Sequence, residues 1–312
     1  MSEQLAVGVS ERTLSDLGTM FRPWLRLVCA DDPDVSILWR RQTDRTSWVI
    51  EAIAQLPRLQ WLHTDTAGID RLPLDELSSR GVLVTNARGI HAVAVSEWAL
   101  AAILTAAKRF DEIVRRSDRR EWAFDANAHE LADRTVVILG VGSIGTALAR
   151  ACSGLGMRVV GVSRTRRPRP YLDRHVSVLD RWIDELPQAS FLVNCLPLTP
   201  ATRNLVDEIA LARLPTGAWF VNIGRGETVD EDALVRVVST GTLGGAILDT
   251  VTNEPLDCES KLWGHPNIIV GSHRSSFTDR TSERTVELFI AEARRYGRGD
   301  PLVNVVNLNE GY

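Results

Sequence analysis

Three glycines at fixed spacing follow an apolar run and precede a stretch of helical period. The run TVVIL leads into Gly140-Val-Gly142-Ser-Ile-Gly145, after which TALARACSGLG is typical of a helix and RVVGV of a second strand. In this context the first glycine permits a tight turn, the second lets the backbone approach a pyrophosphate, and the third allows close helix–strand packing. The helix N-terminus adds free N–H groups and a positive dipole end. The turn therefore predicts a dinucleotide site with the candidate residues Gly140, Gly142, Ser143, Ile144 and Gly145.

The end of the second strand bears on which dinucleotide would bind there. An acidic side chain at this place holds the ribose 2′-hydroxyl of NAD. Here Val162 is followed by Ser163, Arg164 and Thr165, and then by two more arginines. A carboxylate would repel a 2′-phosphate, whereas serine and arginine can bind one through charge-assisted hydrogen bonds. We therefore favour NADP(H) over NAD(H), with Ser163, Arg164 and Thr165 as binding residues, against the alternative of a solvated basic loop.

Three later loops each hold one residue suited to acid–base or electrostatic catalysis. VNIGRG places Arg225 after a strand, AILDTVTNEPL places Glu254 and NIIVGSHRSSFT places His273. Loops that follow the carboxyl ends of parallel strands line the ligand crevice of an open sheet, so these side chains could reach one place. Taken singly, such an arginine is usually a surface ion pair, such a glutamate a solvated charge and such a histidine a structural residue.

These loops require a parallel α/β scaffold, and the apolar pattern of the chain predicts one. Short β-branched or apolar runs alternate with turns and stretches of helical period, which is the signature of βαβ units. We expect two sheets, one from each series of strands, and a helix over 96–116 that could join two domains. Strands are expected at 5–9, 35–39, 59–63 and 82–85, with a helix over 47–55, and then at 135–139, 158–162, 191–194, 218–222, 246–248 and 268–270.

Length and composition agree with a two-domain globular protein. Of 312 residues, 44% are hydrophobic and 24% charged, which excludes disorder over most of the length. The formal net charge of −4 gives no basic excess for binding nucleic acid. Charge-free runs are too short or too interrupted by Gly and Pro to span a membrane, and no signal peptide is readable. The 4 cysteines are widely spaced, so we expect a cytoplasmic protein without a disulfide framework or a bound metal.

With these motifs in view, the chain resembles the D-isomer-specific 2-hydroxyacid dehydrogenases. The resemblance rests on TAGID at 66–70, GVLVTNARGIHAVAVSEWAL at 81–100, the glycine turn, CLPLTPATRNLV at 195–206, VNIGRG, LDTVTNEPL, and the His and Thr that bound 273–278. It implies an α/β fold in which a Rossmann-type coenzyme domain, residues 100–280, is inserted into a flavodoxin-like substrate domain, residues 1–99 plus 281–312. It also implies a homodimer that forms on the helix around 96–116.

The resemblance further implies roles for the candidate residues. Arg225 would bind the substrate carboxylate and polarise the 2-keto oxygen. His273 would donate a proton to that oxygen as hydride arrives, and Glu254 would pair with the imidazole and favour its protonated form. The backbone N–H groups of three residues would cradle the carboxylate: Ala67, Gly68 and Ile69. Five side chains would lie at the nicotinamide and its ribose: Asp249 at the carboxamide, and Leu196, Pro197, Thr202 and Ile223 beside the ribose and ring.

Two positions depart from the family pattern. Ser272 stands where proline is common, and Arg274 stands where a small or apolar residue is usual. Arg274 either points to solvent or adds a cation beside the substrate pocket. We expect an NADPH-preferring reductase of a small 2-keto acid, with glyoxylate and hydroxypyruvate as candidates because Ser-Arg-Thr resembles that subgroup. The alternatives are a corepressor-like sensor that binds NAD(P) without turnover and an NAD-dependent phosphoglycerate-type dehydrogenase.

Overall fold

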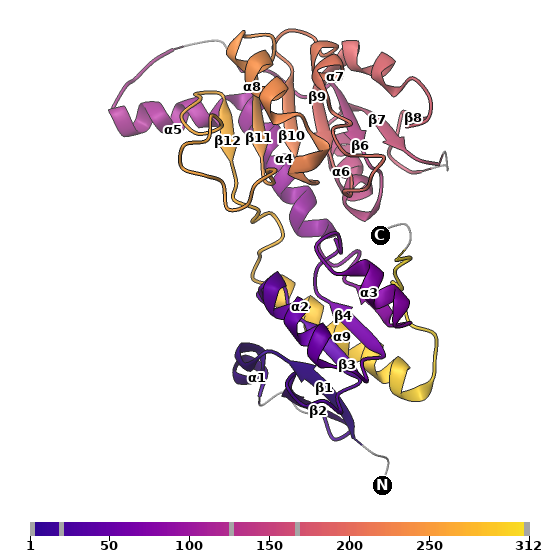
Figure 1. Cartoon of the computed structure of the whole chain (residues 1–312). Coiled ribbons are helices and arrows are strands. Elements are labelled where there is room, and N and C mark those ends of the chain that lie inside the picture. Colours follow the sequence, from indigo (N-terminus) through magenta and orange to yellow (C-terminus); the bar gives the residue numbers. More distant parts are fainter. Residues whose placement is uncertain (1–3, 19–21, 125–127, 166–168, 309–312) are drawn as a thin grey trace. The chain divides into compact units, whose positions relative to one another are not determined.

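A computed structural model describes residues 4–18, 22–124, 128–165 and 169–308 of the chain. The chain divides into two compact units, whose elements are labelled in Figure 1. The first unit comprises residues 1–90 and 279–312, and the second comprises residues 91–278. The expected boundary at 99/100 falls inside the helix α4 (Ala92–Lys108). Because α4 packs against the sheet of the second unit from Val95 to Ala107, the unit begins before this helix and not within it.

The first unit is built on one parallel sheet of 5 strands in the order β2-β1-β3-β4-β5. This is the strand order of flavodoxin-like folds. The strands are β1 (Leu5–Val9), β2 (Leu25–Cys29), β3 (Ile37–Arg40), β4 (Trp61–Thr64) and β5 (Leu83–Asn86). The helices are α1 (Glu11–Leu17), α2 (Thr46–Gln55), α3 (Leu74–Ser79) and α9 (Thr281–Arg298).

The two faces of the first sheet are covered by helices from different parts of the sequence. Leu38 and Leu62 pack with residues of α2 and α3. On the opposite face, Trp39 and Trp61 pack with residues of α9, where the Phe289 ring stacks on Trp39 at 3.9 Å between centroids. Successive strand residues point to opposite faces, so a strand covered on both sides is mostly apolar. The first unit therefore joins the N-terminal strands to a helix that follows the whole second unit in sequence.

The second unit contains a parallel sheet of 7 strands in the order β12-β11-β10-β9-β6-β7-β8. The strands are β6 (Thr135–Leu139), β7 (Arg158–Ser163), β8 (Arg174–Ser177), β9 (Ala189–Asn194), β10 (Trp219–Asn222), β11 (Gly245–Leu248) and β12 (Ile268–Val270). The order reverses at β6, which pairs with both β7 and β9. In such doubly wound sheets, ligands bind beyond the carboxyl ends of the strands at the reversal.

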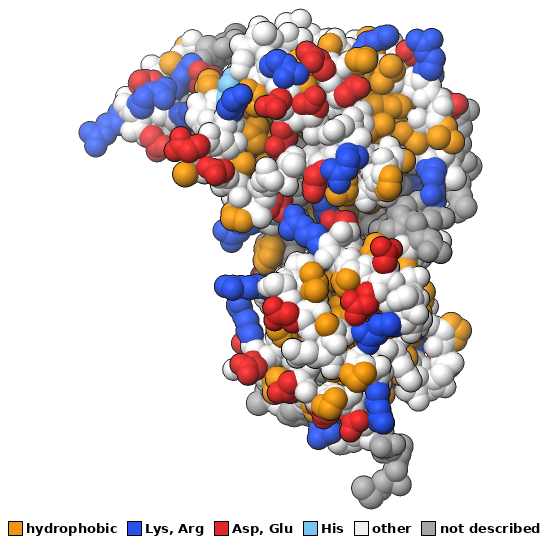
Figure 2. Space-filling model, in the orientation of Figure 1, with side chains coloured by type: hydrophobic (Ala, Val, Ile, Leu, Met, Phe, Trp, Pro, Cys, Tyr) orange, Lys and Arg blue, Asp and Glu red, His pale blue; other side chains and the backbone are white. Residues whose placement is uncertain are grey.

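Helices cover both faces of the second sheet. Val136 and Ile138 of β6 pack with α4 and α6, whereas Val137 and Leu139 pack with α7 and α8. Besides α4, the helices are α5 (Phe110–Arg119), α6 (Ser143–Gly154), α7 (Glu208–Ala212), α8 (Glu231–Ser239), and the short 3₁₀ turns η1 (Trp182–Gln188) and η2 (Gly226–Thr228). On the face drawn in Figure 2, Lys and Arg side chains are interspersed with Asp and Glu.

The structure corrects two sequence expectations. The expected helix over 96–116 is two helices, because Arg109 adopts a left-handed conformation at φ 54° that ends α4 and precedes α5. The guanidinium of Arg109 lies 5.6 Å from the Trp219 ring centre, a contact across more than a hundred residues of sequence. Strands β2 and β8 were not expected. Both are edge strands, and they carry polar residues because a strand at an edge needs less apolar surface.

A buried histidine gives the first unit a specific pH response. His63 in β4 is fully buried, its ring lies 5.5 Å from that of Phe289, and its Nδ1 lies 2.8 Å from the Thr85 hydroxyl. Burial lowers the pKa of His63 from 6.5 to about 3. Because the folded pKa lies below the unfolded one, the neutral ring stabilises the fold fully above about pH 6.5, and this contribution is lost as the pH falls toward 3.

We therefore expect the free energy of unfolding to fall by about 2 kcal/mol between pH 7 and pH 5 through His63 alone. Guanidinium titrations at the two pH values measure the change. His63→Gln keeps a polar group beside Thr85 but does not titrate, so its stability should fall by about 2 kcal/mol less over the same interval. Equal losses in wild type and variant would contradict the prediction.

Candidate coenzyme and catalytic site

At two positions of the glycine turn between β6 and α6, the surrounding backbone leaves no room for a side chain. Gly140 has φ 90°, and a Cβ there would lie 2.9 Å from the Cys195 carbonyl oxygen. A Cβ on Gly145 would collide with the carbonyl oxygen of Gly140. Gly142 differs, because a Cβ there would meet nothing in the described structure within 4 Å. The space in front of Gly142 is therefore open to a ligand.

The first turn of α6 is suited to an anion. Gly142 is the N-cap residue of this helix and has no side chain that could cap it. The leading N–H groups of a helix have no intrahelical partner and carry the positive end of the dipole. Together with the open space at Gly142, this arrangement fits the pyrophosphate of a dinucleotide. Ser143 and Ile144 belong to this turn, as the motif predicts.

The carboxyl end of β7 carries hydroxyl and cationic groups. Ser163, its last residue, donates its hydroxyl to the Thr165 carbonyl at 2.9 Å. Ser177 of β8 donates to the Arg164 carbonyl at 3.2 Å, and the Arg164 side chain is exposed. The two further arginines of the basic stretch, within 166–168, lie outside the described residues. The structure therefore brings Ser163, Arg164 and Thr165 together at one strand end.

Glu254 and His273 form a direct pair. The imidazole Nδ1 lies 2.9 Å from Glu254 Oε2, and the backbone N–H of Val251 donates to Glu254 Oε1 at 3.4 Å. The glutamate side chain is only 16% exposed, whereas that of His273 is 41% exposed. Because the carboxylate holds Nδ1, Nε2 is the nitrogen that the imidazole can offer to a substrate.

The loop that carries His273 is held by Asp249. Ser272 and His273 have φ values of 57° and 51°, and the His273 N–H donates to the Asp249 carbonyl at 2.6 Å. The buried Asp249 carboxylate accepts from the N–H groups of Arg274 at 2.8 Å and Ser275 at 3.1 Å. Proline is locked near φ −65°, so it could not occupy position 272 in this conformation. The departure from the family pattern at Ser272 thus has a backbone cause. The Arg274 side chain is exposed.

Arg225 follows β10 and is anchored by a buried asparagine pair that the sequence analysis missed. Asn194 and Asn222 are paired in register at the ends of β9 and β10, and Asn194 Nδ2 donates to Asn222 Oδ1 at 2.9 Å. Asn222 Nδ2 and the Thr228 hydroxyl both donate to the Arg225 carbonyl, at 3.2 and 2.6 Å. The signal was present in FLVN and WFVN, two apolar strands that each end in asparagine. That the two asparagines pair with each other follows only from the register of β9 and β10.

The remaining residues predicted near the nicotinamide follow β9 and β10. The Thr202 hydroxyl donates to the Pro197 carbonyl at 2.7 Å and accepts from the Thr199 N–H at 2.8 Å, so it closes its own loop. The Leu196 N–H donates to Asn194 Oδ1 at 3.2 Å. Ile223 is buried beside β10. All of these residues lie at the carboxyl edge of the second sheet.

The segment 67–69 lies in the first unit, after β4. The Ala67 carbonyl accepts from Asn86 Nδ2 at 2.8 Å, and the Gly68 carbonyl accepts from the Thr66 hydroxyl at 2.8 Å. Ile69 is buried. Since two carbonyl groups of the segment are engaged, its backbone N–H groups are the polar atoms that it can offer to a carboxylate.

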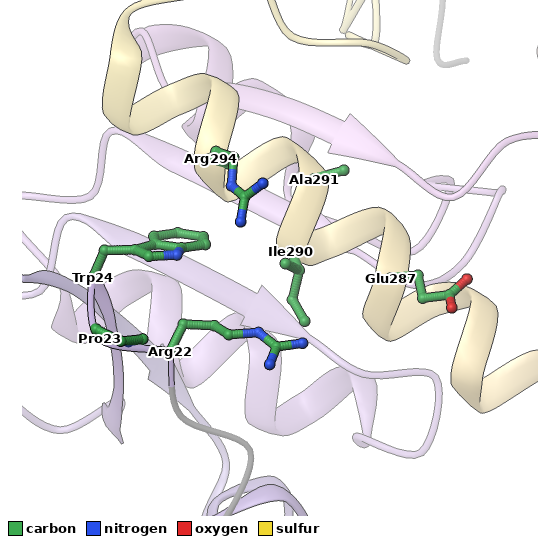
Figure 3. Close-up of a pocket in the computed structure, with 7 residues that line it drawn as sticks. All are labelled: Arg22, Pro23, Trp24, Glu287, Ile290, Ala291 and Arg294. Carbon is green, nitrogen blue, oxygen red and sulfur yellow. The ribbon is translucent and has the colours of Figure 1, made fainter.

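A hollow on the first unit contains none of the predicted site residues. Figure 3 shows it between the segment 22–24 and α9. The Arg294 guanidinium lies 5.4 Å from the ring centre of Trp24.

Within the part of the chain that the structure describes, no helix is long and apolar enough to cross a membrane. No group of three or more His, Cys, Asp or Glu among those same residues could hold a metal ion.

Known proteins match this sequence and fold. The model of the NAD-binding domain of D-isomer specific 2-hydroxyacid dehydrogenases matches residues 100–275. A glyoxylate reductase of Thermococcus gammatolerans is 30% identical over 266 residues, 82% of this chain and 79% of the relative. A glyoxylate/hydroxypyruvate reductase B of Pectobacterium carotovorum is 34% identical over 234 residues, 72% of each chain. A D-isomer specific 2-hydroxyacid dehydrogenase of Xanthobacter autotrophicus, solved with NADPH and MES, superimposes with a TM-score of 0.83 at 26% identity and covers 100% of both chains.

The chain therefore belongs to the D-isomer specific 2-hydroxyacid dehydrogenase family. The expected α/β fold with a Rossmann-type coenzyme domain is confirmed, as is an NAD(P)-dependent oxidoreductase of this family.

Proposed function

We propose that this chain is an NADPH-preferring reductase of a small 2-keto acid, with glyoxylate or hydroxypyruvate as substrate. The observation that carries the proposal is the hydrogen-bonded pair of Glu254 and His273 at the same sheet edge as the glycine turn. A proton donor oriented by a carboxylate beside a dinucleotide site is what reduction of a carbonyl group needs. The names of the two reductase relatives support the substrate class.

The chain's residues divide the work of carbonyl reduction between them. The bound coenzyme supplies the hydride. The guanidinium fork of Arg225 binds the substrate carboxylate and polarises the 2-keto oxygen. His273 gives a proton from Nε2 to that oxygen, and Glu254 stabilises the protonated imidazole through Nδ1. In this proposal the N–H groups of 67–69 hold the carboxylate. Asp249 fixes the backbone of His273 and of the two residues after it, and contacts the nicotinamide carboxamide.

The proposed preference for NADPH rests on the end of β7. A hydroxyl and an arginine stand where NAD-binding proteins place a carboxylate, and both can bind a 2′-phosphate. The Xanthobacter structure that superimposes on this chain contains NADPH, which supports the same assignment.

The experiment that tests this function is oxidation of NADPH and NADH at 340 nm against glyoxylate, hydroxypyruvate, pyruvate and phenylpyruvate. We expect the highest kcat/KM with NADPH as coenzyme and either glyoxylate or hydroxypyruvate as substrate. Preference for NADH would overturn the coenzyme assignment and leave the chemistry standing. Tight coenzyme binding without turnover of any of these acids would contradict the reductase function and favour a sensor that binds NAD(P).

We also propose a cytoplasmic homodimer. The resemblance implies the dimer, and the widely spaced cysteines favour a reducing compartment. Large apolar side chains of the second unit are exposed on and after α5: Phe110, Ile113, Val114, Trp122 and Phe124. Trp122 and Phe124 are 94% and 97% exposed, and exposed apolar surface of this kind is typical of an interface. Light scattering during size-exclusion chromatography should give twice the mass of one chain. The double variant Trp122→Ser, Phe124→Ser should shift the measured mass toward that of a single chain. A wild-type monomer at working concentration would refute the dimer.

A further inference from the structure

A histidine of the edge strand β8 contacts the residue expected to bind the coenzyme 2′-phosphate. His175 is paired with Gly161 of β7, and its Nε2 lies 2.8 Å from the Ser163 hydroxyl oxygen. The Ser163 hydroxyl proton is used toward the Thr165 carbonyl. A hydroxyl has one proton and two lone pairs, so Ser163 Oγ accepts and the imidazole Nε2–H donates.

Two residues of β8 thus contact the residues at the end of β7. His175 holds the hydroxyl of Ser163, while Ser177 donates to the carbonyl of Arg164 and fixes the backbone from which that cation extends. Since β8 is the edge of the sheet, no further strand of the described chain covers this side. The imidazole is half-buried and leaves part of its surface to solvent.

We propose that His175 is a specificity-determining residue for NADPH. Its Nε2–H holds the Ser163 oxygen in place, and the hydroxyl proton of Ser163 turns from the Thr165 carbonyl to the 2′-phosphate when NADPH binds. The proposal rests on the proposed NADPH preference and adds to it a residue outside the loop that follows β7. A phosphate gains from every N–H or O–H donor directed at it, and such charge-assisted bonds are strong. NADH has no phosphate at this place, so its binding should not depend on His175.

The test is coenzyme affinity, measured by fluorescence titration with NADPH and with NADH and independent of turnover. We expect His175→Ala to weaken NADPH binding about tenfold and to leave NADH binding within about twofold. Unchanged NADH affinity shows that the variant is folded. His175→Gln places an amide N–H close to the position of Nε2, so it should retain most of the NADPH affinity.

Two further variants separate a specific contact from a general charge effect. Arg174→Ala removes a cation of the same strand that pairs with Glu185 at 2.8 Å, and it should change NADPH affinity less than twofold. Ser163→Ala combined with His175→Ala should lose less than the product of the single losses, because the two residues share one hydrogen bond.

The possible failures are distinguishable. If wild type prefers NADPH and His175→Ala keeps that preference, the role of His175 is refuted and the proposed function stands. If wild type binds NADPH no more tightly than NADH, the preference itself fails, and the role of His175 fails with it. Equal weakening of NADPH and NADH by His175→Ala would also refute the proposal, because it would indicate a structural role.

Discussion

His273→Ala should lower kcat by about 10²–10⁴-fold, the usual contribution of a positioned proton donor. The affinity for coenzyme should stay within about twofold, since the proposed role of the imidazole is toward the substrate and not the coenzyme. Among the residues that the structure describes, only Nδ1 of the ring is engaged, at 2.9 Å from Glu254, so the variant removes the Nε2 that we propose transfers the proton. Steady-state kinetics with the best 2-keto acid and a separate coenzyme titration measure the two effects.

Two variants serve as comparisons for this result. Glu254→Gln keeps a hydrogen-bond acceptor at Nδ1 but loses the charge that favours the imidazolium, so it should lose less activity than His273→Ala. His129→Ala replaces an exposed histidine of the same unit and should be indistinguishable from wild type. Retention of most activity by His273→Ala would remove this residue from the mechanism.

Alanine at Gly145 should destabilise the second unit by about 3 kcal/mol or more, because a rigid backbone clash is the severe end of overpacking. The added Cβ would collide with the Gly140 carbonyl oxygen, and neither backbone can move without opening the contact between β6 and α6. Thermal and denaturant unfolding measure the loss. Coenzyme binding should be lost together with stability.

Gly142→Ala provides a matched control in the same turn. A Cβ there meets no described atom within 4 Å, and the φ of −76° lies outside the left-handed range that favours glycine. Stability should change by less than about 1 kcal/mol, whereas coenzyme affinity should fall about tenfold or more because the methyl group occupies the ligand's space. Similar losses of stability in both variants would show that the space in front of Gly142 is not open. Unchanged coenzyme affinity in Gly142→Ala would show that the coenzyme does not occupy this space.

Central strands could be predicted from sequence because both of their faces are buried. TVVIL at β6 is apolar after its first residue and buried at every position, and its expected bounds are those of the structure. The edge strand β8 reads RHVS and has no such signal. Arg109, where α4 ends, has its guanidinium over the ring of Trp219, a contact that local sequence cannot reveal.

The candidate site divides in the same way. The glycine turn, Arg225, Glu254 and His273 lie in recognisable local motifs. The groups that hold them do not: Asn194 and Asn222 meet only because β9 and β10 are paired in register, and His175 reaches Ser163 only because β8 lies beside β7. Supporting contacts of this kind depend on strand order, so they become visible only with the fold.

The helix α9 also determines the order in which the protein can be completed during synthesis. The ribosome makes the five strands of the first sheet early, but Phe289, which stacks on Trp39, follows the whole of residues 91–278. Until α9 emerges, the face of the sheet that carries Trp39 and Trp61 lacks its cover. The second unit, whose residues are continuous in sequence, can therefore fold first, while the nascent first unit exposes an aromatic surface of the kind that makes folding chains prone to aggregate.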